Sequence, residues 1–290
     1  MLAHGTSLLT DARARGWAVP AMTTYTLEST RAICQAAERT GLPVILQAGS
    51  SSFGGVGRDL LAATAMAAAR QAGVPVGVHL DHATDPDEIR SCIALGYTSV
   101  MIDGSHLSFE DNIALTRSVV EEAQAVGVWV EAELGALAGD EDSSTDTVAV
   151  EHTHPDQAAE FAARTGVDAL AVAVGNVHGL TATPVRLDLA RLRAIAAATS
   201  APLVLHGASG LPDEDVSAAV AAGVVKVNIN AELRRAHVLA MTEALDSGGD
   251  DIRRLQTLAV TAMTDVAIDK LTLLAGRIAS NRNDTKEAVR

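Results

Sequence analysis

The stretch VPVGVHLDH (residues 74–82) sets the pattern of the whole chain, because an apolar run ends there in carboxylate and imidazole side chains. Side chains along an extended strand alternate between its two faces. His79 and Asp81 therefore share one face, while Val78 and Leu80 share the other. The apolar face is suited to packing on helices and the polar face to lining an interior. The stretch thus predicts a strand that leads into a functional site.

Seven further short apolar runs resemble this one, and each gap between runs holds a helical pattern that most often ends at a glycine. The eight predicted strands span residues 17–21, 43–48, 74–81, 98–103, 128–134, 169–175, 201–206 and 224–230. Strands that alternate with helices predict parallel βα units. Eight such units within 290 residues predict an α/β fold, a single (β/α)8 TIM barrel in one domain that spans residues 1–290.

Two segments interrupt this alternation. Residues 135–155 are Gly-rich and acidic, and a connection of that length in a compact domain is either functional or without fixed structure. Residues 250–290 form a C-terminal helical extension that begins with a long amphipathic pattern. We expect this extension to pack on the barrel or on a second subunit.

Composition excludes several classes of protein. The net charge is −14 and there is no basic stripe, so we expect no binding to nucleic acid. The N-terminal residues lack the pattern of a signal peptide, and no apolar run approaches roughly 18 residues, so we expect no membrane span. The two cysteines, Cys34 and Cys92, lie in apolar helical patterns and are predicted to be buried thiols. A cytoplasmic enzyme is the expectation.

Three histidines follow predicted strands: His82 after the third strand, His178 after the sixth and His206 after the seventh. The carboxyl ends of barrel strands meet on one face, where the active sites of such barrels lie. One histidine at such a position is most simply a polar residue at the start of a loop. Three of them at the same end favour a metal site, because three protein ligands and one open position are typical of catalytic zinc. His79 lies deeper in its strand and is a weaker candidate.

Carboxylates accompany these histidines. Asp81 is able to move a proton at a bound substrate or to orient a ligand histidine. Asp103 and Glu133 end the fourth and fifth strands. The sequence leaves three roles open for these carboxylates: binding a second cation, orienting the histidines, or a structural role. Lys226 faces the interior and needs a carboxylate there, for which Glu131 is the candidate.

The runs HGASG (206–210) and NINA (228–231) end the seventh and eighth strands. In barrels of this kind that region often holds a phosphate through backbone N–H groups. Gly207 and Gly210 allow close backbone approach, and Ser209 adds a hydroxyl. Glycine and serine are also common in ordinary turns.

Taken as an ordered set, six motifs over residues 16–235 resemble the class II, metal-dependent ketose-bisphosphate aldolases, and the tagatose-bisphosphate branch in particular. The motifs are HLDHATDPDEI, SVMIDGSHLSFEDNI, VEAELGALAGDEDS, AVAVGNVHGL, LVLHGASGL and KVNINAEL. The resemblance implies that His82, His178 and His206 hold Zn²⁺. It implies a cradle for dihydroxyacetone phosphate formed by Gly179, Gly207, Ala208, Ser209, Asn228, Ile229, Asn230 and Ala231.

The resemblance also implies a retro-aldol cleavage of fructose or tagatose 1,6-bisphosphate to dihydroxyacetone phosphate and an aldehyde phosphate. Zn²⁺ polarises the ketose carbonyl, Asp81 takes the C4 hydroxyl proton and the loop residue Glu141 moves the C3 proton. Asp103 and Glu133 match positions that hold a second cation in some members. Members form homodimers or homotetramers. Of the three lysines only Lys226 lies in the predicted barrel, so little supports a Schiff-base mechanism.

The chain departs from the family at the substrate rim. Ala21-Met22-Thr23 stands where the family usually has AFN, Ala231 stands where threonine is common, and Asn230 replaces a small residue. These departures favour, as an alternative, an aldolase for another phosphorylated substrate such as a deoxy-phosphogluconate derivative. A non-catalytic barrel subunit of an aldolase complex is a second alternative, against which the intact Asp81 and the three histidines argue.

Overall fold

A computed structural model describes residues 1–135, 152–180, 185–248 and 250–276 of the chain. Eight parallel strands form a closed barrel in sequence order, and β1 pairs with β8. The strands are β1 (Val19–Thr23), β2 (Val44–Gly49), β3 (Val76–Ala83), β4 (Ser99–Ile102), β5 (Trp129–Leu134), β6 (Ala169–Val172), β7 (Leu203–Leu205) and β8 (Val224–Ile229). The predicted TIM barrel is confirmed, and every predicted strand overlaps an observed one.

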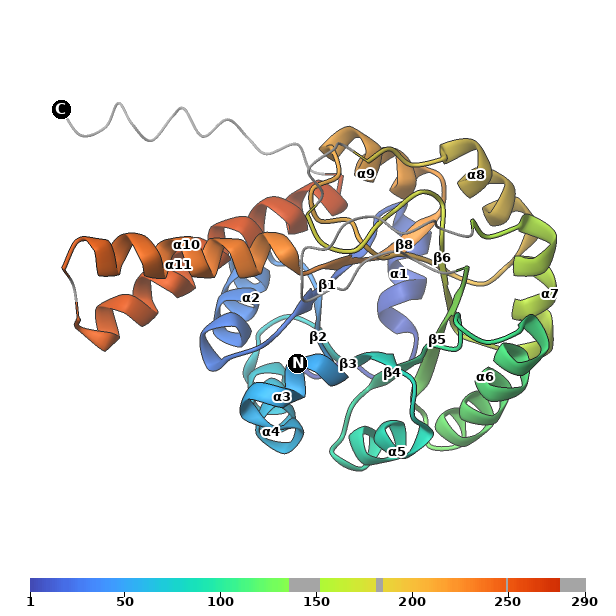
Figure 1. The fold of residues 1–290 in the computed structure, drawn as a ribbon, viewed down its shortest axis with the longest axis horizontal. Helices are drawn as coiled ribbons and strands as arrows, with labels where there is room; N and C mark the ends of the chain where they lie inside the picture. Colours follow the sequence, from blue (N-terminus) through green and yellow to red (C-terminus); the bar gives the residue numbers. More distant parts are fainter. Residues whose placement is uncertain (136–151, 181–184, 249, 277–290) are drawn as a thin grey trace.

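Helices surround the barrel, as Figure 1 shows. They are α1 (Ser7–Arg15), α2 (Leu27–Thr40), α3 (Phe53–Val56) after a 3₁₀ turn (Ser50–Ser52), α4 (Arg58–Gln71), α5 (Pro86–Ala94), α6 (Phe109–Gln124), α7 (Pro155–Thr165), α8 (Leu189–Ala198), α9 (Asp213–Ala221), α10 (Ala231–Asp246) and α11 (Ile252–Leu274). Local sequence signals explain several ends. Asp85 caps α5, whose first residue is proline, and Gly41 ends α2 in the left-handed conformation.

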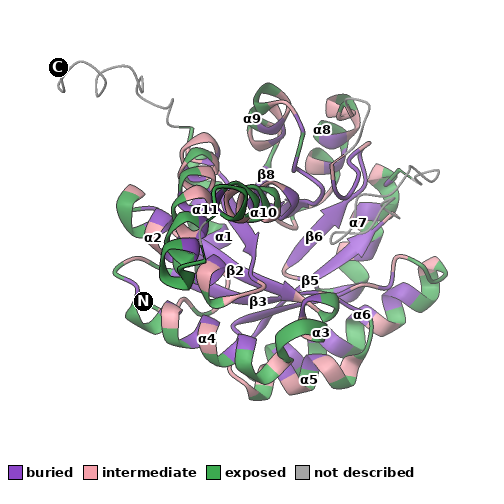
Figure 2. Ribbon diagram, turned by 60° about the vertical axis from the view of Figure 1, so that its left-hand side comes forward, coloured by how far each residue is buried: buried purple, intermediate pink, exposed green. Residues whose placement is uncertain are grey.

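Two apolar layers hold the barrel together. The larger layer lies between the sheet and the helices, and it contains Leu80 of β3 and Val130 of β5. The smaller layer fills the barrel itself, where Ile45 and Trp129 meet Leu9 of α1. Figure 2 shows the result as buried strands enclosed by helices whose outer faces are exposed. The sequence pattern does not predict α1, which carries apolar side chains to the inner layer.

The predicted alternation of side chains fails within β8. Val225 packs in the inner layer, although a regular strand would turn it outward with Val227. The register between β7 and β8 shifts there, because Leu203 pairs with Val224 while Val204 pairs with Lys226. One extra residue in β8 thus forms a β-bulge, which turns Val225 inward.

The predicted helix after Asp250 is α11, which packs on α2. The backbone N–H of Ala18, just before β1, donates a hydrogen bond of 3.0 Å to the carbonyl of Leu274. In Figure 1, α10 and α11 run side by side as a hairpin that extends away from the barrel. None of the helices in the described ranges has both the length and the hydropathy that crossing a membrane requires.

Candidate active site

The end of β3 is irregular, and this irregularity shapes the site. Between Leu80 and Ala83 the pairing with β4 gains one residue on the β3 side. His82 lies in that bulge with a φ of 46°, the single positive value among non-glycine residues in the described part of the chain. Consecutive residues of a regular strand point to opposite faces. The bulge re-aims the backbone at this point, and Asp81 and His82 both join one polar cluster.

The three predicted metal ligands lie together. His82, His178 and His206 each offer a ring nitrogen within 4.8 Å of the others. His206 Nδ1 lies 3.0 Å from His82 Nε2, and the His82 ring centroid lies 4.9 Å from that of His178. Three imidazoles from β3, from the segment after β6 and from the end of β7 therefore converge on one point. This donor set fits a Zn²⁺-like ion, because imidazole nitrogen is among its preferred ligands.

Carboxylates contact two of the three histidines, His82 and His206. Asp103 Oδ2 lies 3.1 Å from His82 Nδ1, and Glu131 Oε1 lies 2.7 Å from His206 Nε2. Glu133 Oε2 is 3.8 Å from His82 Nδ1 and 3.7 Å from His206 Nδ1. The structure thus brings Asp103 and Glu133, the residues predicted for a second cation, to His82. The contact of Asp103 is of the kind that orients a ligand histidine.

Burial and charge divide the histidines into two kinds. Burial, and then the positive charge of His82, hold the pKa values of His178 and His206 well below the ordinary value. Burial also opposes a charge on His82, but the carboxylates of Asp81, Asp103 and Glu133 outweigh burial and raise its pKa well above the ordinary value. Two imidazoles are therefore neutral at pH 7 and able to bind a metal, whereas the third holds a proton.

Asp81 is buried and held by amide donors. Gln47 Nε2 lies 2.9 Å from Asp81 Oδ2, and Asn228 Nδ2 lies 3.2 and 3.3 Å from its two oxygens. Gln47 Nε2 also donates to Thr23 Oγ1 at 3.2 Å, so Thr23 supports the amide that holds Asp81. Gln47 is not among the site residues predicted from the sequence. Its signal is a buried polar residue within the apolar run of β2, level with His79 of β3.

Residues of the predicted phosphate cradle lie in the segment after β6, in the loop after β7 and at the end of β8. Gly207 has a φ of 60°, and a Cβ atom there would lie 2.3 Å from the carbonyl oxygen of Val177, next to His178. Only glycine fits such a contact without displacement of the backbone. Ser209 Oγ accepts a hydrogen bond of 3.3 Å from the N–H of Asn230. The loop after β7 therefore contacts both the segment after β6 and the end of β8.

Other members of the predicted cradle are placed differently. Ala208 and Ile229 are buried in the layer between sheet and helices, so their side chains face away from the barrel mouth. Ala231 is the first residue of α10. Tyr25 is absent from the predicted site, although its hydroxyl donates to Asn230 Oδ1 at 2.9 Å. Glu141, predicted as the loop acid, lies outside the described residues.

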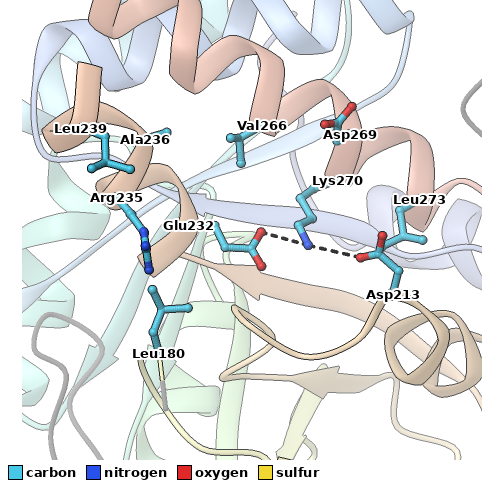
Figure 3. A pocket seen from close by; sticks show the side chains of 10 residues that line it. All are labelled: Leu180, Asp213, Glu232, Arg235, Ala236, Leu239, Val266, Asp269, Lys270 and Leu273. Atoms are coloured by element: carbon cyan, nitrogen blue, oxygen red, sulfur yellow. Dashed lines mark hydrogen bonds and ion pairs between the residues drawn. The ribbon is translucent and has the colours of Figure 1, made fainter. Parts of the chain in front are cut away.

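Ion pairs on the outer side brace the same loop. Glu232 Oε1 accepts a hydrogen bond of 2.9 Å from the N–H of Gly210. Lys270 Nζ lies 2.9 Å from Glu232 Oε2 and 3.5 Å from Asp213, so it links α11 to the starts of α10 and α9 (Figure 3). These residues border a cavity of about 500 Å³ between α10 and α11. The loop after β7 is thus held from outside as well as from the barrel mouth.

Comparisons with known proteins show the family of this chain. The family model for class-II fructose-bisphosphate aldolase matches residues 3–277. The chain is 40% identical over 263 residues to the D-tagatose-1,6-bisphosphate aldolase subunit GatY of Klebsiella oxytoca, covering 90% of this chain and 93% of that one.

Two solved structures are similar along nearly their whole length. The YdjI aldolase of Escherichia coli K12 has a TM-score of 0.86 and 34% identity, covering 94% of this chain and 97% of that chain. A putative fructose-1,6-bisphosphate aldolase of Coccidioides immitis has a TM-score of 0.85 and 37% identity, covering 92% and 94%. The chain is a lyase that belongs to the class II fructose-bisphosphate aldolase family.

Proposed function

We propose that this enzyme cleaves a ketose 1,6-bisphosphate, either fructose or tagatose bisphosphate, to dihydroxyacetone phosphate and an aldehyde phosphate, with Zn²⁺ held by His82, His178 and His206. The observation that carries this proposal is the convergence of three imidazoles beside the buried carboxylate of Asp81. The similarity to a tagatose-bisphosphate aldolase subunit supports the substrate class. When bound, Zn²⁺ supplies polarisation of the substrate carbonyl.

Asp81 is suited to the first proton transfer. Gln47 and Asn228 each donate a hydrogen bond to its carboxylate, and these two donors hold it in a fixed orientation. The carboxylate of Asp81 accepts the proton of the C4 hydroxyl. The C4–O electrons then form the new aldehyde carbonyl, the C3–C4 bond breaks and its electron pair moves to C3, conjugated with the C2 carbonyl of the substrate. A proton must afterwards return to C3, and we assign that step to Glu141.

We place one phosphate of the substrate between the loop after β7 and the start of α10. Gly179, Gly207 and Ser209 contribute from the loops, and Asn228, Asn230 and the backbone of Ala208, Ile229 and Ala231 complete the cradle. Gly207 supports this assignment, because it lets backbone approach backbone closely. The N-terminus of α10 contributes free N–H groups and a partial positive charge.

The test is cleavage of fructose 1,6-bisphosphate and of tagatose 1,6-bisphosphate, with and without a chelator. We expect activity on at least one sugar, lost with the chelator and restored by Zn²⁺. Asp81→Asn should lower kcat by about 10²- to 10⁴-fold while the bound zinc is unchanged. The exposed carboxylate variant Asp59→Asn is the control and should match wild type.

Two outcomes would overturn parts of this proposal. A zinc-loaded protein that cleaves neither sugar would remove the substrate assignment and direct attention to the deoxy-phosphogluconate alternative. A folded protein that binds no zinc would favour the non-catalytic barrel.

We further propose that residues 1–290 form one domain and act in the cytoplasm as a homodimer or homotetramer. Both cysteines are free and buried, which suits a reducing compartment. The α10–α11 hairpin exposes Val238, Leu245 and Ile252, each more than half exposed, which supports contact with a second copy. Light scattering after size exclusion tests the assembly, and a monomer at micromolar concentration would contradict it.

A further inference from the structure

Lys226 of β8 is completely buried, and the reaction proposed above gives it no task. Its ammonium group lies 2.8 Å from Glu131 Oε2, the partner predicted from the sequence. It also donates a hydrogen bond of 2.7 Å to Asn228 Oδ1. A buried charge is costly unless it is paired and hydrogen-bonded. Lys226 meets this condition through two residues, each of which contacts a different part of the site.

The first contact fixes the amide of Asn228. An ammonium group has only donors, so the atom of Asn228 that faces it must be the carbonyl oxygen. The amide nitrogen then has to face the other way, and it lies 3.2 and 3.3 Å from the oxygens of Asp81. A rotated amide would turn its carbonyl oxygen toward the Asp81 carboxylate, where two acceptors repel each other. Lys226 therefore determines which atom Asp81 meets.

The second contact fixes the ring of His206. With Oε2 on Lys226, Glu131 presents Oε1 to His206 Nε2 at 2.7 Å. A carboxylate has only acceptors, so Nε2 must carry the hydrogen and Nδ1 must carry the lone pair. Nδ1 is the atom that faces His82 Nε2, at 3.0 Å. Lys226 therefore acts, through Glu131, on the nitrogen that is available to a metal.

His79 is another basic side chain near the carboxylates of Asp81 and Glu131. Its Nε2 lies 3.8 Å from Asp81 Oδ1 and 3.9 Å from Glu131 Oε2, beyond hydrogen-bond distance. Burial, and then the charge of Lys226, hold its pKa well below the ordinary value, so the ring is neutral at pH 7. Of these two basic side chains, Lys226 is the one in contact with Glu131.

We propose that Lys226 is a positioning residue that sets two catalytic components at once, the Asp81 carboxylate through Asn228 and the metal ligand His206 through Glu131. This inference rests on the proposed function, since it takes Asp81 as the proton acceptor and His206 as a ligand. It goes beyond that function by assigning to one ammonium group the alignment of both components.

The test compares Lys226→Met with Glu131→Gln and Asn228→Ala. Zinc affinity is measured by competition with a chromophoric chelator without substrate, and kcat and KM are measured at saturating zinc. We expect Lys226→Met to weaken zinc binding by about ten- to a hundredfold and to lower kcat by a similar factor, with KM changed less than about threefold. Glu131→Gln should mainly weaken zinc binding. Asn228→Ala should lower kcat and leave zinc affinity near that of wild type.

Folding needs its own control, because Lys226→Met leaves Glu131 buried without its cation. The double variant Lys226→Met/Glu131→Gln removes both charges, and circular dichroism reports whether it folds. Its kcat defect should persist, since Asn228 has still lost its donor. Arg117→Met, which removes a cation from an exposed ion pair, should bind zinc and turn over like wild type.

Two results would overturn the inference. One is a folded double variant with wild-type kcat at saturating zinc, because this would show that Lys226 only fills space. The other is a folded Lys226→Met protein with wild-type zinc affinity. Zinc affinity is measured without substrate, so it tests the role of Lys226 even if the wild-type protein cleaves neither sugar. Failure to cleave either sugar would count against the substrate assignment and not against the role of Lys226.

Discussion

Asp81 and His82 are consecutive in the chain, yet the carboxylate of one and the imidazole of the other belong to the same polar cluster. The bulge at the end of β3 and the left-handed backbone of His82 make this possible. A non-glycine residue at positive φ is a sparsely populated state that surrounding contacts must enforce. Here the contact with Asp103 and the packing against the rings of His178 and His206 hold it.

The contact between Asp103 and His82 predicts a metal phenotype. Asp103→Asn removes the charge of the carboxylate that holds His82 Nδ1 at 3.1 Å. We expect zinc affinity to fall by about ten- to a hundredfold, because a partner of this kind orients the ligand and raises its basicity. Competition with a chelator measures the effect. The exposed variant Glu121→Gln is the matched control, and equal affinities in the two variants would contradict the role given to Asp103.

Metal binding is expected to release a proton. The pKa of His82 lies well above its ordinary value in the metal-free site, so the ring is protonated at pH 7, and that proton must leave before Nε2 binds a metal. About one proton should be released per zinc ion, and apparent affinity should fall as pH is lowered. Calorimetry in two buffers of different ionisation enthalpy measures this number. Heats that do not depend on the buffer would refute the prediction.

Gly207 offers a test of the cradle with a built-in comparison. Gly207 and Gly127 both have positive φ, but a Cβ atom at Gly127 meets no atom within 4 Å, whereas at Gly207 it would lie 2.3 Å from Val177 O. We expect Gly127→Ala to cost roughly 1 kcal/mol of unfolding free energy, from backbone strain alone. Gly207→Ala should cost at least about 3 kcal/mol and raise KM. Urea denaturation measures the unfolding free energy of both variants. Similar losses would show that the loop after β7 accommodates a Cβ atom at position 207 with little strain.

The two thiols are expected to be unreactive in the native protein. Burial, and then the neighbouring Glu38 and Glu88, raise the pKa of Cys34 to about 11 and that of Cys92 to about 12. At pH 8 both are protonated, and a thiol without its charge reacts slowly. The folded state holds these protons more tightly than the unfolded state, so the thiols oppose folding progressively as pH rises above about 9. Alkylation at pH 8 should require urea, and rapid labelling of the native protein would contradict this.

Much of the architecture follows from the sequence because each strand is a short apolar run between helical patterns. The sequence predicts the ends of individual strands less accurately. The apolar run 169–175 predicts a longer strand than β6 (Ala169–Val172). The backbone N–H of Ala173 donates to Thr153 Oγ1, and that of Val174 donates to Asn176 Oδ1, so both leave the ladder. The end of β6 therefore depends on side-chain acceptors, one of which, Thr153, is distant in the sequence, while the other, Asn176, lies two residues further along the chain.

Some of the site residues are likewise predicted from the sequence, and others are not. His82, His178 and His206 follow from the rule that barrel strands end on one face, and the pairing of Lys226 with Glu131 follows from strand alternation. Gln47 and Tyr25 are not predicted, because each is identified only by a partner on another strand or loop. The bulge at His82 is not predicted either. Its sequence carries no glycine that would mark it.

The pairing of β1 with β8 has a consequence for the synthesis of the protein. β1 is completed by β8, and Ala18 finds its acceptor only at Leu274 of α11. A nascent chain on the ribosome therefore presents an open edge at β1 until β8 and α11 have emerged, and contacts between such distant residues form slowly. Open edges of this kind invite pairing with other chains. We expect the enzyme to depend on chaperones while it is made, far more than its buried, well-packed barrel would suggest once it is complete.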